Sequence, residues 1–566
     1  MKTEKLSILF PWQDRITYRR LSEETQHDLG LDSLCRQAGT TPQEQRLIRQ
    51  TLSSLTDSPE VANFRSAVFQ DILTHRAMRE KMLEQLRRIE VLQEYGGLRS
   101  GSDKTLGVWD LMHRLDEVRS YIRCIEALRD CLSGEDIASE GLTELLQSVN
   151  EIYEEHDFAA LKADVDSLKP DINSIRSVTL GVNLNERFEA VSMGLISVNG
   201  KAFTKSGVIS GFADALLNRD HIRREADWNE SYHYYPADGR AGVPAGLEKA
   251  ARAAMVTRNP LLGMTLASVP ADTGARDVMQ GMDTAASAML TATAKHLRSV
   301  LNRYVGVTVQ DIIGLIPEFL YYIRMAEFVE KKQAEGWRFC RAHATADGGM
   351  RARGFYNLKL MDAIPAAEAV PNDLDFDREK RLYILTGANR GGKTTLTQAV
   401  GQLFVLAQGG VSVPADSLEF TPADVICTHF PADEDKTLDL GRLGEECKRF
   451  RELYAACGAR SLMLLNETFS TTSFEEGYRI ALDACRALLK KGVRTVYNTH
   501  MHKLAACLDQ VNGDGGEAKA LSLVAVSEGG RRSFRVKPGP PEGTSMARDI
   551  AEKYGVTFEQ LTAGNP

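Results

Sequence analysis

The 566-residue sequence has little that points to a secreted, metal-stapled or membrane protein. Its nine cysteines form no C-x-x-C pair, which excludes a zinc ribbon and gives no sign of a disulfide framework. No run of about 18 apolar residues occurs, so we expect no membrane-spanning helix. The N-terminus lacks the pattern of a signal peptide. We therefore expect a cytoplasmic protein with reduced thiols and no membrane contact.

The sequence also lacks an excess of positive charge. Lysine and arginine number 69 against 77 acidic residues, and the net charge is −8. This excludes a wholly basic nucleic-acid coat, although a local basic groove is enough to bind DNA. Glycine (45) exceeds proline (18) without a G-X-Y period, which excludes a fibrous protein.

Two kinds of periodicity divide the chain. From about residue 18 to 168 apolar residues recur at helical spacing, and Thr41-Pro42-Gln43-Glu44 predicts a capped helix start. The segments 177–184 and 194–198 are rich in β-branched residues and predict a small β-containing insertion at about 172–210. Helical spacing returns from about 308 to 337. The stretch 380–505 alternates apolar strands with helices, which indicates a parallel α/β sheet.

A glycine-rich segment follows the first strand of this stretch. Residues 387–394 fit G-x-x-x-x-G-K-[ST], between a predicted strand and a predicted helix. Backbone N–H groups there can cradle phosphates, the lysine adds a positive charge, and the threonine hydroxyl can bind Mg²⁺. The candidate nucleotide-binding residues are Gly387, Ala388, Asn389, Arg390, Gly391, Gly392, Lys393, Thr394 and Thr395.

Two further strands end in polar residues. Asn466 and Glu467 follow an apolar strand where nucleotide hydrolases place Asp-Glu. Glu467 is the candidate for activating water. Asn466, with Thr394, is the candidate metal ligand, but it brings no negative charge. His500 follows the third strand and is a candidate sensor of the γ-phosphate; a metal pair with His502 is the weaker alternative.

Five motifs, in the same order along the chain as in the family, resemble those of the MutS DNA mismatch-repair ATPases. The segment 386–395 resembles the family's TGPN-x-GGK[ST]T loop, and 370–374 resembles the segment before its first nucleotide strand. The segment 408–415 is similar to its AQ-x-G-x-x-VPA motif, 466–473 to its DE-x-GRGTS run, and 497–500 to its ATH switch. A looser resemblance to a core-domain helix covers 59–69.

The resemblance implies a fold, cofactors and an assembly. It implies an α/β P-loop ATPase domain of the ABC/MutS type at the C-terminal side, preceded by a mostly α-helical core and lever with a small β-containing clamp insertion. It implies ATP and Mg²⁺ as cofactors and a homodimer in which Thr472 and Ser473 reach the partner's nucleotide. The expected domains are a helical core at 1–110, a lever with the insertion at 111–350, and the ATPase domain at 351–566.

The departures from the family pattern are specific. Apolar residues at helical spacing begin near the N-terminus, so we expect no N-terminal mismatch-reading domain. Phe469 and Thr471 replace glycines, which predicts an altered loop. Ala369 stands where many relatives carry an aromatic residue that stacks on adenine. Asn466 predicts slow or weakly Mg²⁺-coupled hydrolysis.

The interpretation is therefore a MutS-like ATPase that clamps mismatched, branched or otherwise structured DNA in repair or recombination control. The candidate DNA contacts lie in or after the insertion, where a solvated surface is an equal alternative: Lys201, Lys205, Arg219, Arg223, Arg224, Tyr232, His233, Tyr234, Tyr235 and Arg240. The alternative function is a nucleotide-gated switch for protein interactions, with weak ATPase activity and no direct DNA role. A transporter-type or chromosome-structuring ATPase is disfavoured, because neither an LSGG-like segment nor a long heptad repeat is present.

Overall fold

The computed structural model describes most of the chain in thirteen segments. These are residues 7–11, 15–93, 108–167, 177–184, 190–199, 233–234, 314–387, 391–431, 441–513, 516–528, 531–541, 552 and 554–563. The chain divides into two compact units. Unit 1 comprises Met1–Leu86, Asp130–Gln147 and Gly314–Pro566, and unit 2 comprises Arg87–Arg129 and Ser148–Ile313.

Unit 2 consists of helices and one antiparallel sheet in its described part. The sheet has the order β3-β4-β5, and β3 and β4 occupy the places where the sequence predicts strands. In the helices, the Arg129 guanidinium lies 4.0 Å from the centre of the Tyr153 ring, and Lys162 pairs with Glu126. The elements wholly or partly in this unit are α5 (Arg76–Gln93), α6 (Val108–Leu132), α7 (Glu140–Glu154), α8 (His156–Ser167), β3 (Ser177–Leu184), β4 (Ala190–Asn199) and β5 (His233–Tyr234).

Unit 1 begins with short helices that pack with one long helix, α16. Thr41 and Glu44 form the expected capping box at the start of α3, with Pro42 at its first position. The N-terminal elements are β1 (Arg19–Arg20), α1 (Glu23–Asp28), α2 (Leu31–Ala38), α3 (Pro42–Leu52), β2 (Ser54–Leu55) and α4 (Pro59–Thr74). Helix α16 (Leu315–Ala334) returns to contact α2, α3 and α4.

A four-stranded sheet of order β6-β10-β7-β8 follows α16. Its strands are β6 (Ala342–Ala344), β7 (Met350–Phe355), β8 (Asn372–Phe376) and β10 (Ser417–Phe420), with α17 (Leu360–Ala363) and a 3-10 turn (Ala366–Glu368) between β7 and β8. Buried and exposed residues alternate along β10, so one face of this sheet packs inward.

The largest sheet has six strands in the order β11-β12-β13-β9-β14-β15. Neighbouring strands from β11 to β14 are parallel, and only β15 is antiparallel. The strands are β9 (Lys380–Gly387), β11 (Ile426–His429), β12 (Leu462–Asn466), β13 (Arg494–Asn498), β14 (Lys519–Glu528) and β15 (Arg531–Pro538). The strands β9, β12 and β13 and the helices beside them lie where the sequence predicts the α/β sheet.

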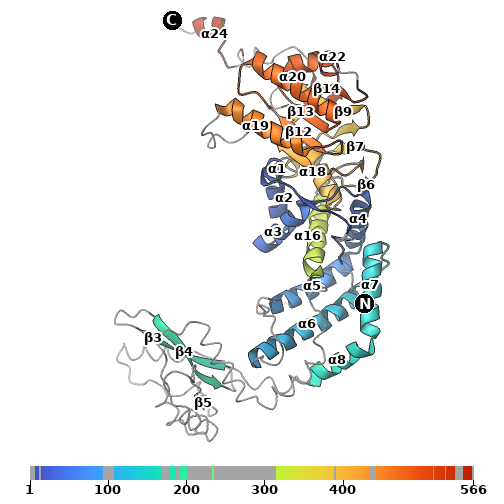
Figure 1. Cartoon of the computed structure of the whole chain (residues 1–566), viewed down its shortest axis with the longest axis vertical. Coiled ribbons are helices and arrows are strands. Elements are labelled where there is room, and N and C mark those ends of the chain that lie inside the picture. The colour runs from blue at the N-terminus through green and yellow to red at the C-terminus, as the bar shows by residue number, and fades with distance from the viewer. Residues whose placement is uncertain are drawn as a thin grey trace. The chain divides into compact units, whose positions relative to one another are not determined.

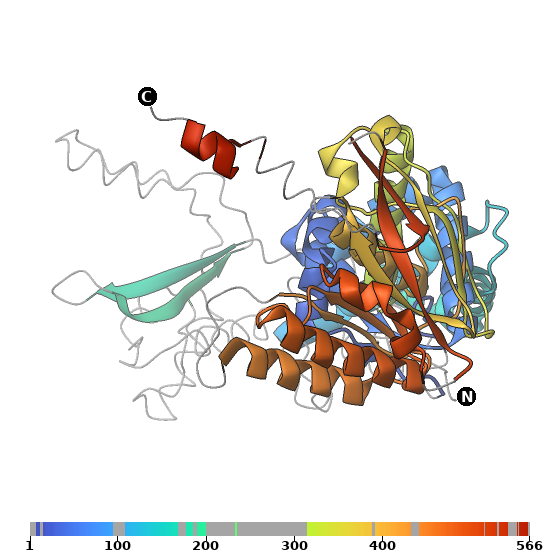
Figure 2. The same ribbon diagram turned by 90° about the horizontal axis from the view of Figure 1, so that it is seen from above.

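Helices cover both faces of this sheet. Helix α18 contacts β9, β12 and β13 on one face and α3 and α4 on its other side (Figure 1). Almost all of its side chains are buried. On the opposite face α19 and α20 run side by side (Figure 2). The helices are α18 (Lys393–Gln408), α19 (Gly441–Ala456), α20 (Phe474–Lys491), α21 (His502–Ala506), α22 (Leu508–Val511) and the C-terminal α24 (Phe558–Ala563).

A fully buried arginine fixes the C-terminal end of α18 to the N-terminal helices. Arg65 of α4 donates to the Gln408 carbonyl at 2.9 Å and to the Leu9 carbonyl, and its guanidinium lies about equally close to the Phe10 and Tyr18 rings. A buried cation needs such acceptors, because burial without partners would strongly destabilise the fold. Within the described residues, no helix is long and apolar enough to cross a membrane.

Candidate functional site at the carboxyl edge of the parallel sheet

Strand register brings the candidate residues together. Asn466 pairs with Asn498 across β12 and β13, and Asn498 pairs with Leu385 of β9. Parallel strands end at the same edge, so the residues that follow β9, β12 and β13 meet there. Open α/β sheets bind their ligands at this edge.

The glycine-rich segment begins and ends with left-handed backbone. Gly387 has φ +129° and Gly392, the N-cap residue of α18, has φ +86°. A Cβ at Gly387 would stand 2.9 Å from the Ala525 Cβ, so no larger residue fits there. Ala388, Asn389 and Arg390 lie outside the described residues.

Lys393 is the first residue of α18 and its side chain is buried. Its ammonium donates to the Gly387 carbonyl at 3.0 Å, which holds the ammonium beside the first residue of the glycine-rich segment. Burial lowers the pKa of Lys393, and the nearby Glu467 partly offsets that effect. A desolvated ammonium beside the N-terminus of a 16-residue helix suits an anionic ligand.

Thr394, Asn466 and Asn498 form a closed triangle of hydrogen bonds. The Thr394 hydroxyl donates to Asn466 Oδ1 at 3.1 Å. Asn498 Nδ2 donates to Thr394 Oγ1 at 3.1 Å and also to Asn466 Oδ1. All three groups are neutral, and among the described residues no cluster of His, Cys, Asp and Glu could hold a metal.

The oxygens of Thr394 and Asn466 fit Mg²⁺ in type and spacing. Adjacent ligands about 2.0–2.1 Å from Mg²⁺ stand about 3 Å apart in an octahedral shell. The 3.1 Å between Thr394 Oγ1 and Asn466 Oδ1 matches that spacing. The missing element is negative charge, which bound phosphates would have to supply.

Glu467 lies beside Lys393 and His500. His500 Nε2 lies 3.0 Å from Glu467 Oε1, and the His500 amide donates to Oε2 at 3.2 Å. Burial raises the pKa of Glu467, while the His500 amide and Lys393 act in the opposite direction. Burial, then Lys393, lowers the pKa of His500. Both shifts favour the uncharged forms, and a raised pKa makes the Glu467 carboxylate a stronger base.

The turn after β12 holds two non-glycine residues in left-handed backbone. Glu467 has φ +53° and Phe469 has φ +64°. Left-handed backbone at a non-glycine residue is unfavourable by roughly 1–3 kcal/mol, and it persists only where the surrounding structure fixes it. Phe469 is buried, with its ring centre 5.3 Å from that of Phe450. Phenylalanine thus occupies a conformation that glycine adopts readily, and side-chain packing holds it there.

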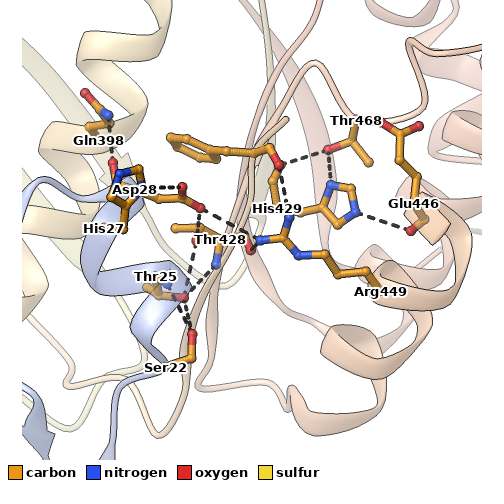
Figure 3. Close-up of polar contacts among 11 residues, drawn as sticks. Ser22, Thr25, His27, Asp28, Gln398, Thr428, His429, Glu446, Arg449 and Thr468 are labelled. Carbon is orange, nitrogen blue, oxygen red and sulfur yellow. Dashed lines mark hydrogen bonds and ion pairs between the residues drawn. The ribbon is translucent and has the colours of Figure 1, made fainter. Parts of the chain in front are cut away.

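Thr468, between these two residues, is held by β11 and β13. Its carbonyl accepts from the Tyr497 hydroxyl at 2.5 Å. Its Oγ1 lies 3.0 Å from His429 Nδ1 (Figure 3). His429 Nε2 lies 3.3 Å from the Glu446 carbonyl, which can only accept. Burial, then the positive charge of Arg449, lowers the pKa of His429 to about 4. The neutral ring can donate from Nε2 to Glu446, because that carbonyl only accepts. The one hydroxyl hydrogen of Thr468 has two acceptors within reach, the His429 carbonyl at 3.2 Å and Nδ1 at 3.0 Å.

The same network continues to the N-terminal helix α1 (Figure 3). Thr428 donates to Asp28 Oδ2 at 2.6 Å, and Arg449 lies 3.9 Å from that oxygen. Gln398 of α18 donates to the Asp28 carbonyl at 2.7 Å. Asp28 is thus held both by the helix that carries Lys393 and by the strand that carries His429.

Thr472 and Ser473 lie on the surface at the start of α20. Both hydroxyls donate to Glu476 Oε2, at 2.7 and 2.9 Å. Ser473 is the N-cap residue, but its side chain makes no capping hydrogen bond. Within the described chain the acceptor of both exposed hydroxyls is thus Glu476, which is not part of the Lys393 site.

Sequence reasoning missed three residues of the site. Asn498 lies in the segment 497–500 that resembles the ATH switch, and in that segment the sequence predicts only His500 as a site residue. His429 carries no sequence signal. Phe534 has φ +56° and is 47% exposed as a residue, and its Cδ1 would lie 3.5 Å from a Cβ at Gly392. Asn372 holds this part of β15 by donating to the Phe534 carbonyl at 3.2 Å and accepting from the Val536 amide at 2.8 Å.

Comparison with known proteins agrees with this architecture. Residues 383–536 match the model of MutS domain V, and residues 57–213 match that of the MutS2 N-terminal domain. A protein named DNA mismatch repair protein MutS from Lactobacillus delbrueckii subsp. bulgaricus is 27% identical over 238 residues, which is 42% of this chain and 26% of that protein. A protein named Endonuclease MutS2 from Thermus thermophilus is 28% identical over 194 residues, 34% of this chain and 25% of that protein.

A further relative, DNA mismatch repair protein MutS from Chlorobium chlorochromatii, is 32% identical over 145 residues, 25% of this chain and 17% of that protein. The chain thus spans about a quarter or less of the length of these relatives. The fold and the matches define a protein with a MutS-type domain V at its C-terminal side, preceded by helices. The chain is thus similar to MutS-family proteins over two stretches, residues 57–213 and 383–536.

The depressed pKa of His429 predicts a pH-dependent stability. In the unfolded state His429 has its ordinary pKa near 6.5, whereas in the folded state its pKa is about 4. Between these two values the unfolded state binds more protons than the folded state, so acidification favours unfolding. Between pH 7.5 and pH 5 this amounts to about 2 kcal/mol. We expect His429→Gln, which keeps a donor and an acceptor, to lessen the drop in the midpoint of urea unfolding. The exposed His27→Gln should leave it unchanged, and an equal drop in both variants would contradict the assignment.

Proposed function

We propose that the chain is a MutS-like ATPase that couples ATP binding and hydrolysis to the clamping of mismatched, branched or otherwise structured DNA. The observation that carries the proposal is the meeting of Lys393, Thr394, Asn466 and Glu467 at one sheet edge. The match to MutS domain V over 383–536 supports it, since this range contains all four residues.

ATP would bind with its phosphates over the segment Gly387–Thr395. Lys393 would pair with the phosphates, and Thr394 with Asn466 would hold Mg²⁺. When bound, the metal supplies positive charge beside the phosphates. Phe534 is the candidate surface for the base, since its exposed ring lies next to Gly392 and no aromatic residue occupies position 369.

Glu467 would orient and deprotonate the attacking water, and His500 would hold that carboxylate and respond to the γ-phosphate. The contact between His500 Nε2 and Glu467 supports this division. Asn466 offers no charge to the metal, so we expect slow hydrolysis.

A homodimer would complete the site. The exposed Thr472 and Ser473 at the N-terminus of α20 are the candidates for reaching a partner's γ-phosphate, because hydroxyls and a helix N-terminus suit an anion. Their present acceptor, Glu476, would have to release them.

Clamping of DNA rests on the family. Relatives carry the names of mismatch-repair proteins, and the MutS2 N-terminal match over 57–213 includes β3 and β4. The domains 1–110, 111–350 and 351–566 remain our proposal for core, lever and ATPase. The alternative function, a nucleotide-gated switch for protein partners with weak ATPase activity, is favoured by the net charge of −8.

Replacing Lys393 by alanine should remove nucleotide binding. The charge-assisted contacts of one ammonium are worth about 1.5–3 kcal/mol, so affinity should fall by roughly 10- to 150-fold. The measurement is titration calorimetry with ADP and with a nonhydrolysable ATP analogue. Lys490→Ala, which changes an exposed lysine at the far end of α20, is the matched control. Unaltered affinity in Lys393→Ala would exclude the proposed phosphate site.

Replacing Glu467 by glutamine should separate binding from hydrolysis. The amide keeps the shape and hydrogen bonds of the side chain but cannot accept a proton from water, so turnover should fall by about 10²–10⁴-fold with affinity retained. Phosphate release under single-turnover conditions measures this loss. Glu475→Gln, in an exposed ion pair with Lys503, should hydrolyse at the parental rate. A Glu467→Gln variant that keeps the parental rate would remove Glu467 from the mechanism.

Retention of duplex, mismatched and junction DNA on filters, over a salt series and with and without ATP, tests the DNA role. Neutralising several phosphates gives a falling affinity with salt, with a slope of about −0.9 per phosphate contacted. A steep slope that depends on nucleotide state supports the clamp. No retention at low salt, together with intact ATP binding, would favour the protein-interaction switch.

A further inference from the structure

Asn498 occupies the place between Thr394 and Asn466 in an unusual way. Its Nδ2 carries two hydrogens, and each is directed at one of the two oxygens that fit Mg²⁺. The Thr394 hydroxyl uses its own hydrogen on Asn466 Oδ1. Both Asn498 amide hydrogens and the Thr394 hydroxyl hydrogen are therefore used, and the two oxygens accept three hydrogen bonds between them.

The other end of the same amide has no such partner. Asn498 Oδ1 is buried and makes no hydrogen bond within the described chain. An unpartnered buried oxygen is unfavourable by roughly 1–3 kcal/mol, so the amide orientation is not set by ordinary packing of its outer end. The opposite orientation would bring Oδ1 against Asn466 Oδ1, oxygen to oxygen. The two inward oxygens thus determine the orientation.

The Asn498 amide group donates to the same two oxygens that a metal ion would bind, but it carries no charge. A carboxylate at position 466 would draw a metal ion, whereas a neutral carboxamide oxygen holds one weakly and is satisfied by an amide donor. The triangle is therefore complete without a metal. Entry of a cation must displace both Asn498 hydrogen bonds.

We propose that Asn498 is a resident donor at the metal position and that it sets the metal requirement of the site, so that nucleotide binds almost as well without Mg²⁺ as with it. The inference rests on the proposed function, because it concerns the nucleotide that this edge would bind. Asn466 and Asn498 act as a matched pair: the neutral acceptor on β12 is accompanied by a neutral donor directly across on β13.

The experiment compares the affinity for ADP in excess MgCl₂ with that in excess EDTA, by titration calorimetry on the full chain. We expect the two dissociation constants of the parent protein to agree within about threefold. Asn498→Ala removes the donor and opens the position, so the metal should strengthen ADP binding by about tenfold or more. Asn498→Asp, nearly identical in shape, should also become strongly metal-dependent, because its carboxylate faces Asn466 Oδ1 without a donor.

Two further measurements guard the interpretation. Asn512→Ala removes another carboxamide, one that bonds only the Ala520 backbone, and should leave the ratio of dissociation constants as in the parent. Electron paramagnetic resonance of Mn²⁺ should detect one tightly held ion in the ADP complex of Asn498→Ala and much weaker binding in the parent. Circular dichroism establishes that each variant is folded.

The outcomes separate the two proposals. A parent protein that binds no ADP in either buffer would overturn the proposed function. A parent that binds ADP more than tenfold better with Mg²⁺ would overturn only the inference about Asn498, and needs no variant to do so. An equal ratio in the parent and in Asn498→Asp, with ADP bound in both, would likewise overturn it.

Discussion

The turn that follows β12 is the constraint on which the site depends. Two residues in left-handed backbone, Glu467 and Phe469, flank Thr468. Without external contacts this backbone would relax, and the Glu467 carboxylate would leave the neighbourhood of Lys393. The contacts come from three directions: Tyr497 holds the Thr468 carbonyl, His429 holds its side chain, and the aromatic cluster around Phe450 holds Phe469. The position of the candidate catalytic carboxylate is therefore an outcome of tertiary packing.

Charge at the site is unusually low. Thr394, Asn466 and Asn498 are neutral, and burial shifts the pKa of Lys393 down and that of Glu467 up. A site of this kind gains most of its favourable electrostatics only when an anion arrives, because the ammonium and the helix N-terminus then acquire a partner. This arrangement supports the proposal of slow hydrolysis, as does the neutral residue at position 466.

Local patterns in the sequence were enough for the elements and for half of the site. The capping box at Thr41, the strands at β9, β12 and β13, and the glycine-rich segment before Lys393 each depend on neighbouring residues, so each could be predicted. The rest depends on contacts over long sequence distances. Asn498 meets Asn466 only through strand register, and Phe534 comes beside Gly392 only because β15 ends the sheet.

Replacement of signature glycines shows a related limit. The sequence predicts that Phe469 alters a loop that needs left-handed backbone; in the structure Phe469 itself adopts left-handed backbone, with φ +64°. The explanation is burial: the ring gains contacts with His429 and Phe450 that offset the strain, and no local rule could anticipate these partners. The same two partners lie on β11 and α19, so one substitution changes which elements the turn depends on.

Both halves of the site converge on one short stretch of the N-terminal helices. From α18, Gln398 and Gln402 donate to the carbonyls of Asp28 and Leu29. From β11, Thr428 donates to the Asp28 carboxylate, one residue before the His429 that holds the turn. Asp28 therefore joins the helix that carries Lys393 to the strand that carries His429, through its carbonyl on one side and its carboxylate on the other. The positions of these two elements are fixed relative to each other by one residue of α1.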